Sequence, residues 1–194
     1  MTTNSGPSTA ETHLLNRARA GDRTAFSTLV REASPSLERL AVRMLGHRHD
    51  AEDVTQEAVM YAWRRLDTFR GDARFGTWLH RILVSRSLDA LRRRKRKPTA
   101  ELPVAIPSAT ADPAETVAEA DLEVAVRAAI DSLPPVQRVT LLLRVDHGLT
   151  YDEIAYVLGS SRNAVRVNLV AGRKRLAVTL RGVVDLGQGR EAVS

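Results

Sequence analysis

The chain has 194 residues, a formal net charge of +6 and no cysteine, and 43% of its residues are hydrophobic. This length suits one ordinary domain or two small ones, and the lack of cysteine excludes disulfides, thiolate metal sites and thiol redox sensing. No apolar run approaches the length of a membrane span, and the N-terminus lacks the basic start and apolar core of a signal peptide, so we expect a soluble, cytoplasmic protein. The basic balance favours a polyanionic partner, although solubility alone would also account for it.

Nearly every patterned segment has the period of an α-helix. Apolar residues recur at spacings of three and four within residues 26–33 and again, after Pro35, within residues 37–45. Gly46 is predicted to end that helix and Asp50 to cap the next one. No alternating run is long enough to predict a sheet, so the sequence predicts an all-α fold.

A proline-rich break divides the chain. Four of the eight prolines fall within residues 98–113, among Ala, Thr and Ser, a composition that resists helix formation and suits an extended linker. We therefore expect two small helical domains joined by a Pro-rich linker. The expected order is a disordered N-terminus (1–10), a first domain (11–97), the linker (98–113), a second domain (114–181) and a flexible tail (182–194).

Residues 150–176 fit a helix-turn-helix. Thr150 and Glu153 form a capping-box pattern, and Gly159 allows the tight turn before Ser160 or Ser161 caps a second helix. The expected core-facing positions are Ile154, Ala155 and Leu158 in the first helix and Val165, Leu169, Gly172 and Leu176 in the second. Two short helices that pack together without binding DNA would give the same pattern, and this alternative stays open.

The opposite face of the second helix carries side chains that can read DNA. Asn163 could read adenine, and the valines at 167 and 170 could contact thymine methyl groups. Three arginines on one flank, Arg162, Arg166 and Arg173, could hold phosphates. So apolar a face is unusual for a helix in the major groove, and a protein partner that covers the valines is the alternative.

Aromatic residues cluster in the first half, next to a basic segment. Five of the eight lie within 18 residues: Tyr61, Trp63, Phe69, Phe75 and Trp78. A helix over residues 77–92 follows and ends in a basic run. Rings beside a basic surface suit single-stranded nucleic acid, because each stacked base contributes roughly 1–3 kcal/mol. The spacing of Tyr61 predicts instead that it lies in the core, Trp78 is expected to be partly buried, and the basic run could be a solvated helix end.

The helix expected over residues 51–65 has an acidic second face, formed by Asp53, Gln56, Glu57 and Met60. An acidic patch on a basic protein does not suit contact with DNA. It is either a plain solvated face or a docking surface for another protein.

These motifs together resemble a known family. Residues 50–58 (DAEDVTQEA), 75–82 (FGTWLHRI) and 89–93 (DALRR) are similar to domain 2 of bacterial sigma factors. Residues 133–138 (LPPVQR) and 148–155 (GLTYDEIA) are similar to sigma domain 4. With only these two domains and a short linker, the chain resembles an extracytoplasmic-function (ECF) sigma factor of the sigma-70 family.

The resemblance implies promoter recognition, with catalysis left to RNA polymerase and with no cofactor or metal. The face formed by Asp53, Gln56, Glu57 and Met60 would dock on the β′ clamp helices of core RNA polymerase. The loop over residues 69–76 would capture a flipped base of the non-template strand. The residues implied at the −10 element are Phe69, Arg70, Asp72, Arg74, Phe75, Trp78, Arg81, Ser85, Arg86, Asp89, Arg92 and Arg93.

In the second domain, the resemblance implies that the second helix reads the −35 element while an apolar surface meets the β flap. The residues implied there are Ser161, Arg162, Asn163, Ala164, Arg166, Val167, Asn168 and Arg173. An anti-sigma factor is a further expected partner. The family usually has Gly and Thr where this chain has Asn163 and Ala164, and arginines where it has Asn168 and Ala171, so we expect an atypical −35 element or a greater dependence on domain 2.

Two rival hypotheses come from other classes of protein. A polymerase-independent regulator would use the same helix-turn-helix on duplex DNA, but it gives no role to the acidic face or the aromatic loop. A metal site at His47 and His49 would be needed for a metalloenzyme, yet two histidines at this spacing without further ligands are a weak signal.

Overall fold

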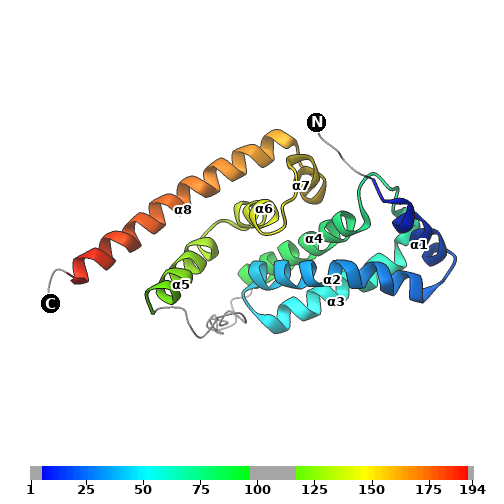
Figure 1. Ribbon diagram of the computed structural model, residues 1–194, viewed down its shortest axis with the longest axis horizontal. Helices are drawn as coiled ribbons and strands as arrows, with labels where there is room; N and C mark the ends of the chain where they lie inside the picture. The colour runs from blue at the N-terminus through cyan, green and yellow to red at the C-terminus, as the bar shows by residue number, and fades with distance from the viewer. Residues whose placement is uncertain (1–5, 97–116, 192–194) are drawn as a thin grey trace.

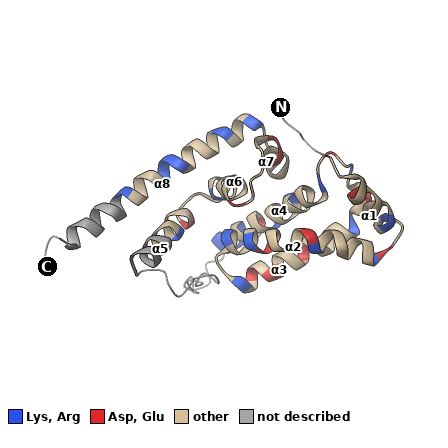
Figure 2. Cartoon of the chain, viewed as in Figure 1, with Lys and Arg blue, Asp and Glu red and all other residues tan. Residues whose placement is uncertain are grey.

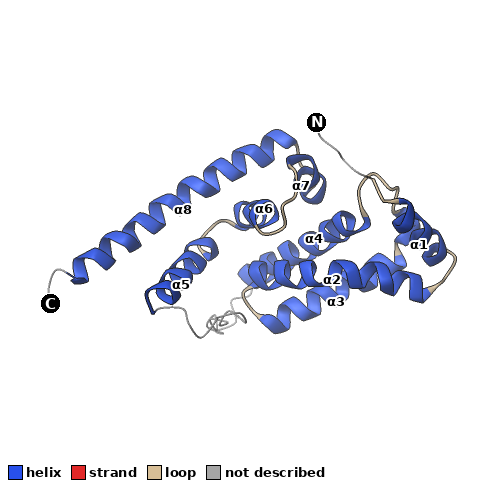
Figure 3. Ribbon diagram, viewed as in Figure 1, coloured by secondary structure: helices blue, strands red, loops and turns tan. Residues whose placement is uncertain are grey.

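The computed structural model describes residues 6–96 and 117–191, except for the side chains of residues 117–123 and 182–191. The described residues form eight α-helices and one short 3-10 helix with no strand, which confirms the all-α class (Figures 1 and 3). The elements are α1 (Thr9–Arg19), α2 (Arg23–Leu45), α3 (Arg48–Arg64), η1 (Leu66–Thr68), α4 (Phe75–Arg96), α5 (Val117–Asp131), α6 (Pro135–Val145), α7 (Tyr151–Leu158) and α8 (Arg162–Glu191). The expected linker at 98–113 lies outside the described residues.

Helices α1 to α4 pack around an aliphatic core in which α2 contacts each of the other three. Leu37 and Leu40 of α2 and Leu79 and Leu83 of α4 are completely buried. These positions follow the apolar spacing of each helix, so burial of one stripe per helix holds the N-terminal half together. Pro35 lies inside α2, which continues through it to Gly46, whose left-handed backbone (φ 75°) ends the helix as predicted.

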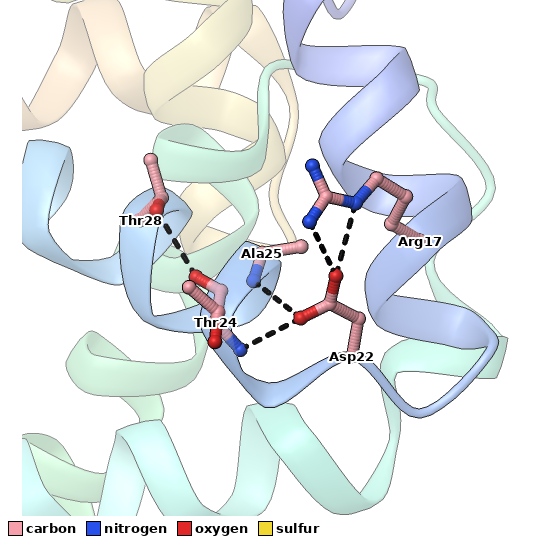
Figure 4. Close-up of polar contacts among 5 residues, drawn as sticks. All are labelled: Arg17, Asp22, Thr24, Ala25 and Thr28. Atoms are coloured by element: carbon pink, nitrogen blue, oxygen red, sulfur yellow. Dashed lines mark hydrogen bonds and ion pairs between the residues drawn. The ribbon is translucent and has the colours of Figure 1, made fainter.

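The start of α2 is tied to the end of α1 by one carboxylate. The N-cap residue Asp22 accepts hydrogen bonds from the backbone N–H groups of Thr24 and Ala25, at 2.9 and 3.0 Å (Figure 4). Its other oxygen pairs with Arg17 of α1 at 2.6 Å. The bond from Ala25, followed by that from Arg17, lowers the pKa of Asp22 below its usual value. Asp22 therefore satisfies orphan amides of α2 and fixes the corner between the two helices.

Three expected boundaries in the N-terminal half are wrong. Helix α1 begins at Thr9, because Ser8 and Glu11 form a capping box, so residues 9 and 10 are not disordered. Helix α3 begins at Arg48 with His47 at the N-cap, and Asp50 lies in the first turn, where the helix dipole still favours its charge. Helix α4 begins two residues before the predicted residue 77 and runs four residues past 92.

The C-terminal half contains the predicted helix-turn-helix, formed by α7 and α8. Thr150 and Glu153 form the capping box, Gly159 has the left-handed backbone (φ 59°), and the Ser161 hydroxyl accepts the N–H of Ala164 at 3.1 Å. The core positions Ile154, Val165 and Leu169 are buried, as is Gly172, whereas Ala155, Leu158 and Leu176 are only partly buried. Helix α8 continues to Glu191, so the expected flexible tail from residue 182 is wrong for the backbone up to that point.

The two halves pack on each other, with α7 beside α4 and α6 beside α2 (Figure 1). Arg138 of α6 donates to the backbone oxygen of Met44 at 3.1 Å, and Arg43 pairs with Asp146 at 3.3 Å. The buried apolar residues of both halves form one continuous cluster. The described residues therefore form one closed arrangement.

A chain of hydrogen bonds runs through this contact. The Nδ1 atom of His80 lies 2.7 Å from the oxygen of Gly76, which can only accept, so Nδ1 carries the proton and Nε2 of the neutral ring is an acceptor. The Ser36 hydroxyl therefore donates to His80 Nε2 at 3.1 Å and accepts from Nδ1 of His147 at 2.7 Å. Burial lowers the pKa of His80 to about 4, and burial also lowers the pKa of His147. The contact is thus built for two neutral imidazoles.

Replacement of Asp22 should separate its two roles. We expect Asp22→Ala to lower the thermal midpoint by a few degrees, because it removes both the N-cap and the pair with Arg17. Asp22→Asn keeps a cap acceptor and should retain most of the stability. Circular dichroism melting would check this, and equal midpoints for the two variants would contradict the capping role.

Acid should open the contact between the halves. Both histidine pKa values are lowered, so the closed form is favoured above about pH 6.5 and loses that advantage as the pH falls toward 4. Each proton taken up on opening changes the open-to-closed ratio about tenfold per pH unit. Among the charged groups near the pair, Asp146 favours protonation of His147, whereas Arg39 and Arg43 oppose it. Glu11, Glu32, Arg74 and Glu153 line the same pocket as the two rings.

The chain has no cysteine, so Arg31→Cys and Lys174→Cys on the two halves allow specific labelling for energy transfer. Transfer should fall between pH 7.5 and 5, and His147→Gln, which keeps a donor for Ser36 but cannot gain charge, should weaken the dependence. His13→Gln, at an exposed histidine of α1, is the matched control and should behave as wild type. If the energy transfer stays constant over this pH range while the helix content is intact, protonation of the histidine pair does not open the contact between the halves.

Candidate nucleic-acid interface

The aromatic rings of the first half form a buried cluster. Phe69 and Phe75 are 2% and 1% exposed and meet edge to face with ring centroids 6.2 Å apart. Phe26 packs on Phe75, and Trp78 packs on both Phe69 and Phe75. The hypothesis that these rings are stacking platforms is therefore wrong for Phe69 and Phe75 in this arrangement, because their faces are covered by other rings. Trp78, predicted to be partly buried, is 8% exposed.

Tyr61 departs from the prediction in the opposite direction. It is 38% exposed and not in the core, and the Arg86 guanidinium lies over its ring, 4.6 Å from the centroid. The spacing from Val54 and Ala58, which are buried, predicted burial for Tyr61 too. One turn further along, the same stripe reaches the edge of the domain, and the ring extends over α4.

A surface pocket of about 370 Å³ opens between α3, η1 and α4. One stripe of α4 lines it with the predicted residues Trp78, Arg81, Ser85, Arg86 and Asp89. Sequence reasoning missed the other walls, which are Tyr61, Thr68 and Ile82. The helical spacing of Trp78, Ile82 and Ser85 was the available signal for Ile82, whereas Tyr61 and Thr68 reach the pocket only through tertiary packing.

Acidic neighbours moderate the charge of the pocket wall and of the helix end behind it. Arg86 pairs with Glu57 at 3.3 Å, and Arg92 pairs with Asp89 at 2.7 Å. Beyond them, the last turn of α4 gathers basic side chains (Figure 2). Arg93 is exposed there, as are Arg70, Asp72 and Arg74 in the loop before α4. The predicted −10 residues thus divide into buried rings and a polar set at the surface, of which Arg81, Ser85, Arg86 and Asp89 line this pocket.

The acidic face of α3 is exposed, as its spacing predicted. Asp53, Gln56, Glu57 and Met60 all reach the surface, and Met60 is 47% exposed. Beside Met60, an apolar depression of about 360 Å³ lies between α2 and α3, and Phe26 and Trp63 contribute to its walls. An exposed methionine next to an apolar depression and acidic groups suits a protein partner.

The outward face of α8 carries the predicted set of residues near its N-terminus. Asn163 is exposed and its Oδ1 accepts from Arg166 at 3.2 Å. Arg162 pairs with Asp152 of α7 at 3.2 Å. Val167 and Val170 are 57% and 64% exposed. Among the remaining predicted residues, Ser161 and Arg173 are exposed, whereas Ala164 and Asn168 are half-buried.

The other end of the α4 stripe lies against α7. The Arg81 guanidinium lies over the Tyr156 ring, 5.0 Å from its centroid, and burial raises the pKa of Tyr156. A second pocket of about 240 Å³ at this contact is lined by Arg81, Ser85 and Arg92 on one side and by residues 157–159 on the other. Part of the predicted −10 surface therefore faces the C-terminal half in this arrangement.

The two histidines of the metal hypothesis lie at the N-cap and in the first turn of α3, not on a loop, and have other partners. Arg94 contacts Nε2 of His47 at 2.8 Å, and His49 lies 3.2 Å from Asp53. Within residues 6–96 and 117–191, no group of three or more His, Asp or Glu side chains is placed to hold a metal ion. In the same part of the chain, no helix has the length and apolar character needed to cross a membrane.

Residues 29–97 match the family model for sigma-70 region 2, and residues 123–176 match that for sigma-70 region 4. The chain is 35% identical over 178 residues to the ECF RNA polymerase sigma factor SigM of Mycobacterium tuberculosis, covering 92% of this chain and 88% of SigM. It is 36% identical to the ECF RNA polymerase sigma factor SigE of Mycolicibacterium smegmatis, and this match covers 80% of the chain but only 63% of SigE.

A solved structure has the same fold. The sigma factor RpoE from Bartonella quintana, in complex with the anti-sigma factor NepR, superposes with a TM-score of 0.65 at 22% identity, covering 80% of this chain and 96% of RpoE. The order of the two matched regions, the helix-turn-helix and the identity to SigM over most of both chains agree. The chain belongs to the ECF sigma factors of the sigma-70 family.

Proposed function

We propose that this chain binds core RNA polymerase and directs transcription initiation by recognising and opening a −10 element and reading a −35 element. The observation that carries the proposal is the pocket lined by Tyr61, Ile82 and Ser85, which lies beside the loop before α4 and the basic end of that helix. A regulator that only reads duplex DNA has no use for such a pocket, whereas a protein that holds an unpaired base requires one.

The pocket offers the groups that a flipped base needs. Tyr61 supplies an aromatic face already stacked on a guanidinium, and Ser85, Arg86 and Asp89 supply donors and acceptors for the edge of a base. Around it, Arg70, Arg74, Arg92 and Arg93 would hold the phosphates of the non-template strand, which fixes its path without reading its sequence. Phe69 and Phe75 would act from the core, by holding the ends of the loop.

In the second half, α8 would enter the major groove by its N-terminal end. Asn163 can pair with both the N6 and N7 positions of adenine, and Val167 and Val170 can contact thymine methyl groups. Arg162, Arg166 and Arg173 would bind phosphates. Two of these groups are held within the protein, Arg162 by Asp152 and Asn163 by Arg166, so DNA must displace those partners. This supports an atypical −35 element or greater dependence on the −10 contacts.

The remaining exposed surfaces would take protein partners. The acidic face of α3 would dock on the β′ clamp helices, and the apolar surface of the second half on the β flap. An anti-sigma factor is a further proposed partner, by analogy with RpoE, whose structure contains NepR. The protein would work in the cytoplasm, without enzymatic activity or a cofactor of its own, because the polymerase performs the chemistry.

Run-off transcription tests the proposal directly. Core RNA polymerase with the full-length protein on a library of genomic fragments should give new discrete starts, and alignment upstream of them would yield both promoter elements. No starts, combined with tight binding of the protein alone to duplex DNA, would support the polymerase-independent regulator instead.

Charge reversal on α3 should impair polymerase binding. Glu57 is 56% exposed at its side chain, and we expect Glu57→Lys to weaken binding to core polymerase about tenfold or more, because opposed charges at an interface become like charges. Glu38→Lys, at an exposed position of α2, is the matched control and should bind normally. Fluorescence anisotropy of labelled protein titrated with core enzyme would measure both, and an equal loss in the two variants would argue against the α3 face.

Removal of the Tyr61 ring should weaken single-strand binding selectively. In the holoenzyme, Tyr61→Ala should reduce affinity for a single-stranded −10 oligonucleotide by about 5- to 100-fold, the range for loss of one stacked base. Tyr61→Phe keeps the ring and should bind nearly as wild type, and −35 duplex binding should not change in either variant. Normal −10 binding by the alanine variant would exclude the pocket as the site of base capture.

A further inference from the structure

The loop between η1 and α4 is held at both ends by α1. At its C-terminal end, the carboxylate Oε1 of Glu11 accepts the backbone N–H of Phe75 at 2.5 Å. At its N-terminal end, the Arg19 guanidinium donates to the backbone oxygen of Phe69. These contacts join residues 64 and 50 positions apart in the chain. Residues 70–74 therefore lie between two contacts with the same helix, α1.

The contact at Phe75 has a clear physical basis. Phe75 is the first residue of α4, so its N–H is one of the four amides that have no partner within the helix. A carboxylate there also lies at the positive end of the helix dipole. The same Glu11 side chain accepts the N–H of Ser8 through its other oxygen at 3.3 Å. Glu11 thus joins the N-terminus of α1 to the N-terminus of α4 through one carboxylate.

The segment before α1 adds a third contact. A methyl group added at Gly6 would lie 3.3 Å from the backbone oxygen of Gly71, which is closer than most side chains tolerate. Gly71 has a left-handed backbone (φ 79°) and lies beside the ring of Pro7. The tip of the loop and the residues before α1 are therefore in close contact, which limits the positions the tip can take.

The loop itself has little burial to hold it. Between its two ends only Ala73 is buried, whereas Arg70, Asp72 and Arg74 are exposed. The path of the backbone through the exposed residues therefore depends on its anchors. The match to the sigma-70 region 2 model begins at residue 29, so Glu11 and Arg19 lie outside it.

We propose that α1 is a positioning element for −10 recognition, in which Glu11 and Arg19 fix the two ends of the loop before α4 in the geometry that receives the non-template strand. The proposal rests on the proposed function, since it assumes that this loop and the adjacent pocket contact that strand. Glu11 and Arg19 touch no base in it. They act by reducing the number of loop conformations, which lowers the entropy lost when the strand binds.

The test uses holoenzyme assembled from full-length variants and a single-stranded −10 oligonucleotide taken from a promoter identified by run-off transcription. Glu11→Ala and Arg19→Ala should each weaken binding about tenfold, as expected for loss of a hydrogen bond to a charged group. Glu11→Gln keeps an oxygen acceptor and should restore part of the affinity. Binding to core polymerase and to −35 duplex should remain at the wild-type level in all three.

Arg17→Ala is the matched control on the same helix. It removes the exposed ion pair with Asp22 at the C-terminal end of that helix, so it should cost stability without weakening −10 binding. Hydrogen exchange distinguishes a local effect from a loss of overall stability. The amide of Phe75 should exchange faster in Glu11→Ala, while the amides in the middle of α4 keep their protection.

The outcomes separate this proposal from the one it rests on. If Tyr61→Ala does not weaken −10 binding, the pocket is not the site of base capture, and the positioning role of α1 is overturned with it. If Tyr61→Ala weakens −10 binding but Glu11→Ala and Arg19→Ala bind the −10 strand as wild type does, only the positioning role of α1 is overturned. An equal loss in Arg17→Ala would likewise overturn it, because the effect would then come from helix stability alone.

Discussion

Aromatic packing of Phe26, Phe69, Phe75 and Trp78 joins three elements of the N-terminal half into one unit. Phe69 ends η1 and Phe75 begins α4, so the ring cluster brings both ends of the intervening loop to one place in the core. The exposed residues between them are thereby held at the surface. Hydrophobic packing here sets the position of polar groups that it does not itself contain.

The helices of both halves could be predicted because their signals are local. A buried stripe at helical spacing, a capping box at Thr150 and glycines with left-handed backbone at residues 46 and 159 each depend on a few neighbouring residues. The α4 residues that line the pocket were instead implied by the resemblance to sigma domain 2. The ends of several helices were misplaced, where alternative caps such as Ser8 and Asp50 compete, and α1 was not predicted as a helix.

The errors at the site have a different cause. Periodicity says which side of a helix faces inward, but not how far a neighbouring helix extends to cover it. Tyr61 follows the stripe of Val54 and Ala58 and yet is 38% exposed, because its ring reaches the surface beside Arg86 of α4. The contacts of Glu11 with Phe75 and of Ser36 with His147 leave no local pattern, since they join residues 64 and 111 positions apart.

The Arg81 guanidinium lies over the Tyr156 ring, so the closed arrangement holds one of the implied −10 side chains against α7. Under the proposed function, promoter DNA that needs Arg81 in another position favours the form in which α7 and α4 are separated. Thermodynamic linkage makes this effect reciprocal: if core polymerase binds the separated form better, it raises affinity for the −10 strand by the same factor by which that strand raises affinity for polymerase. The contact between the halves, of which this cation–π pair is one part, would thus couple the two binding events of initiation.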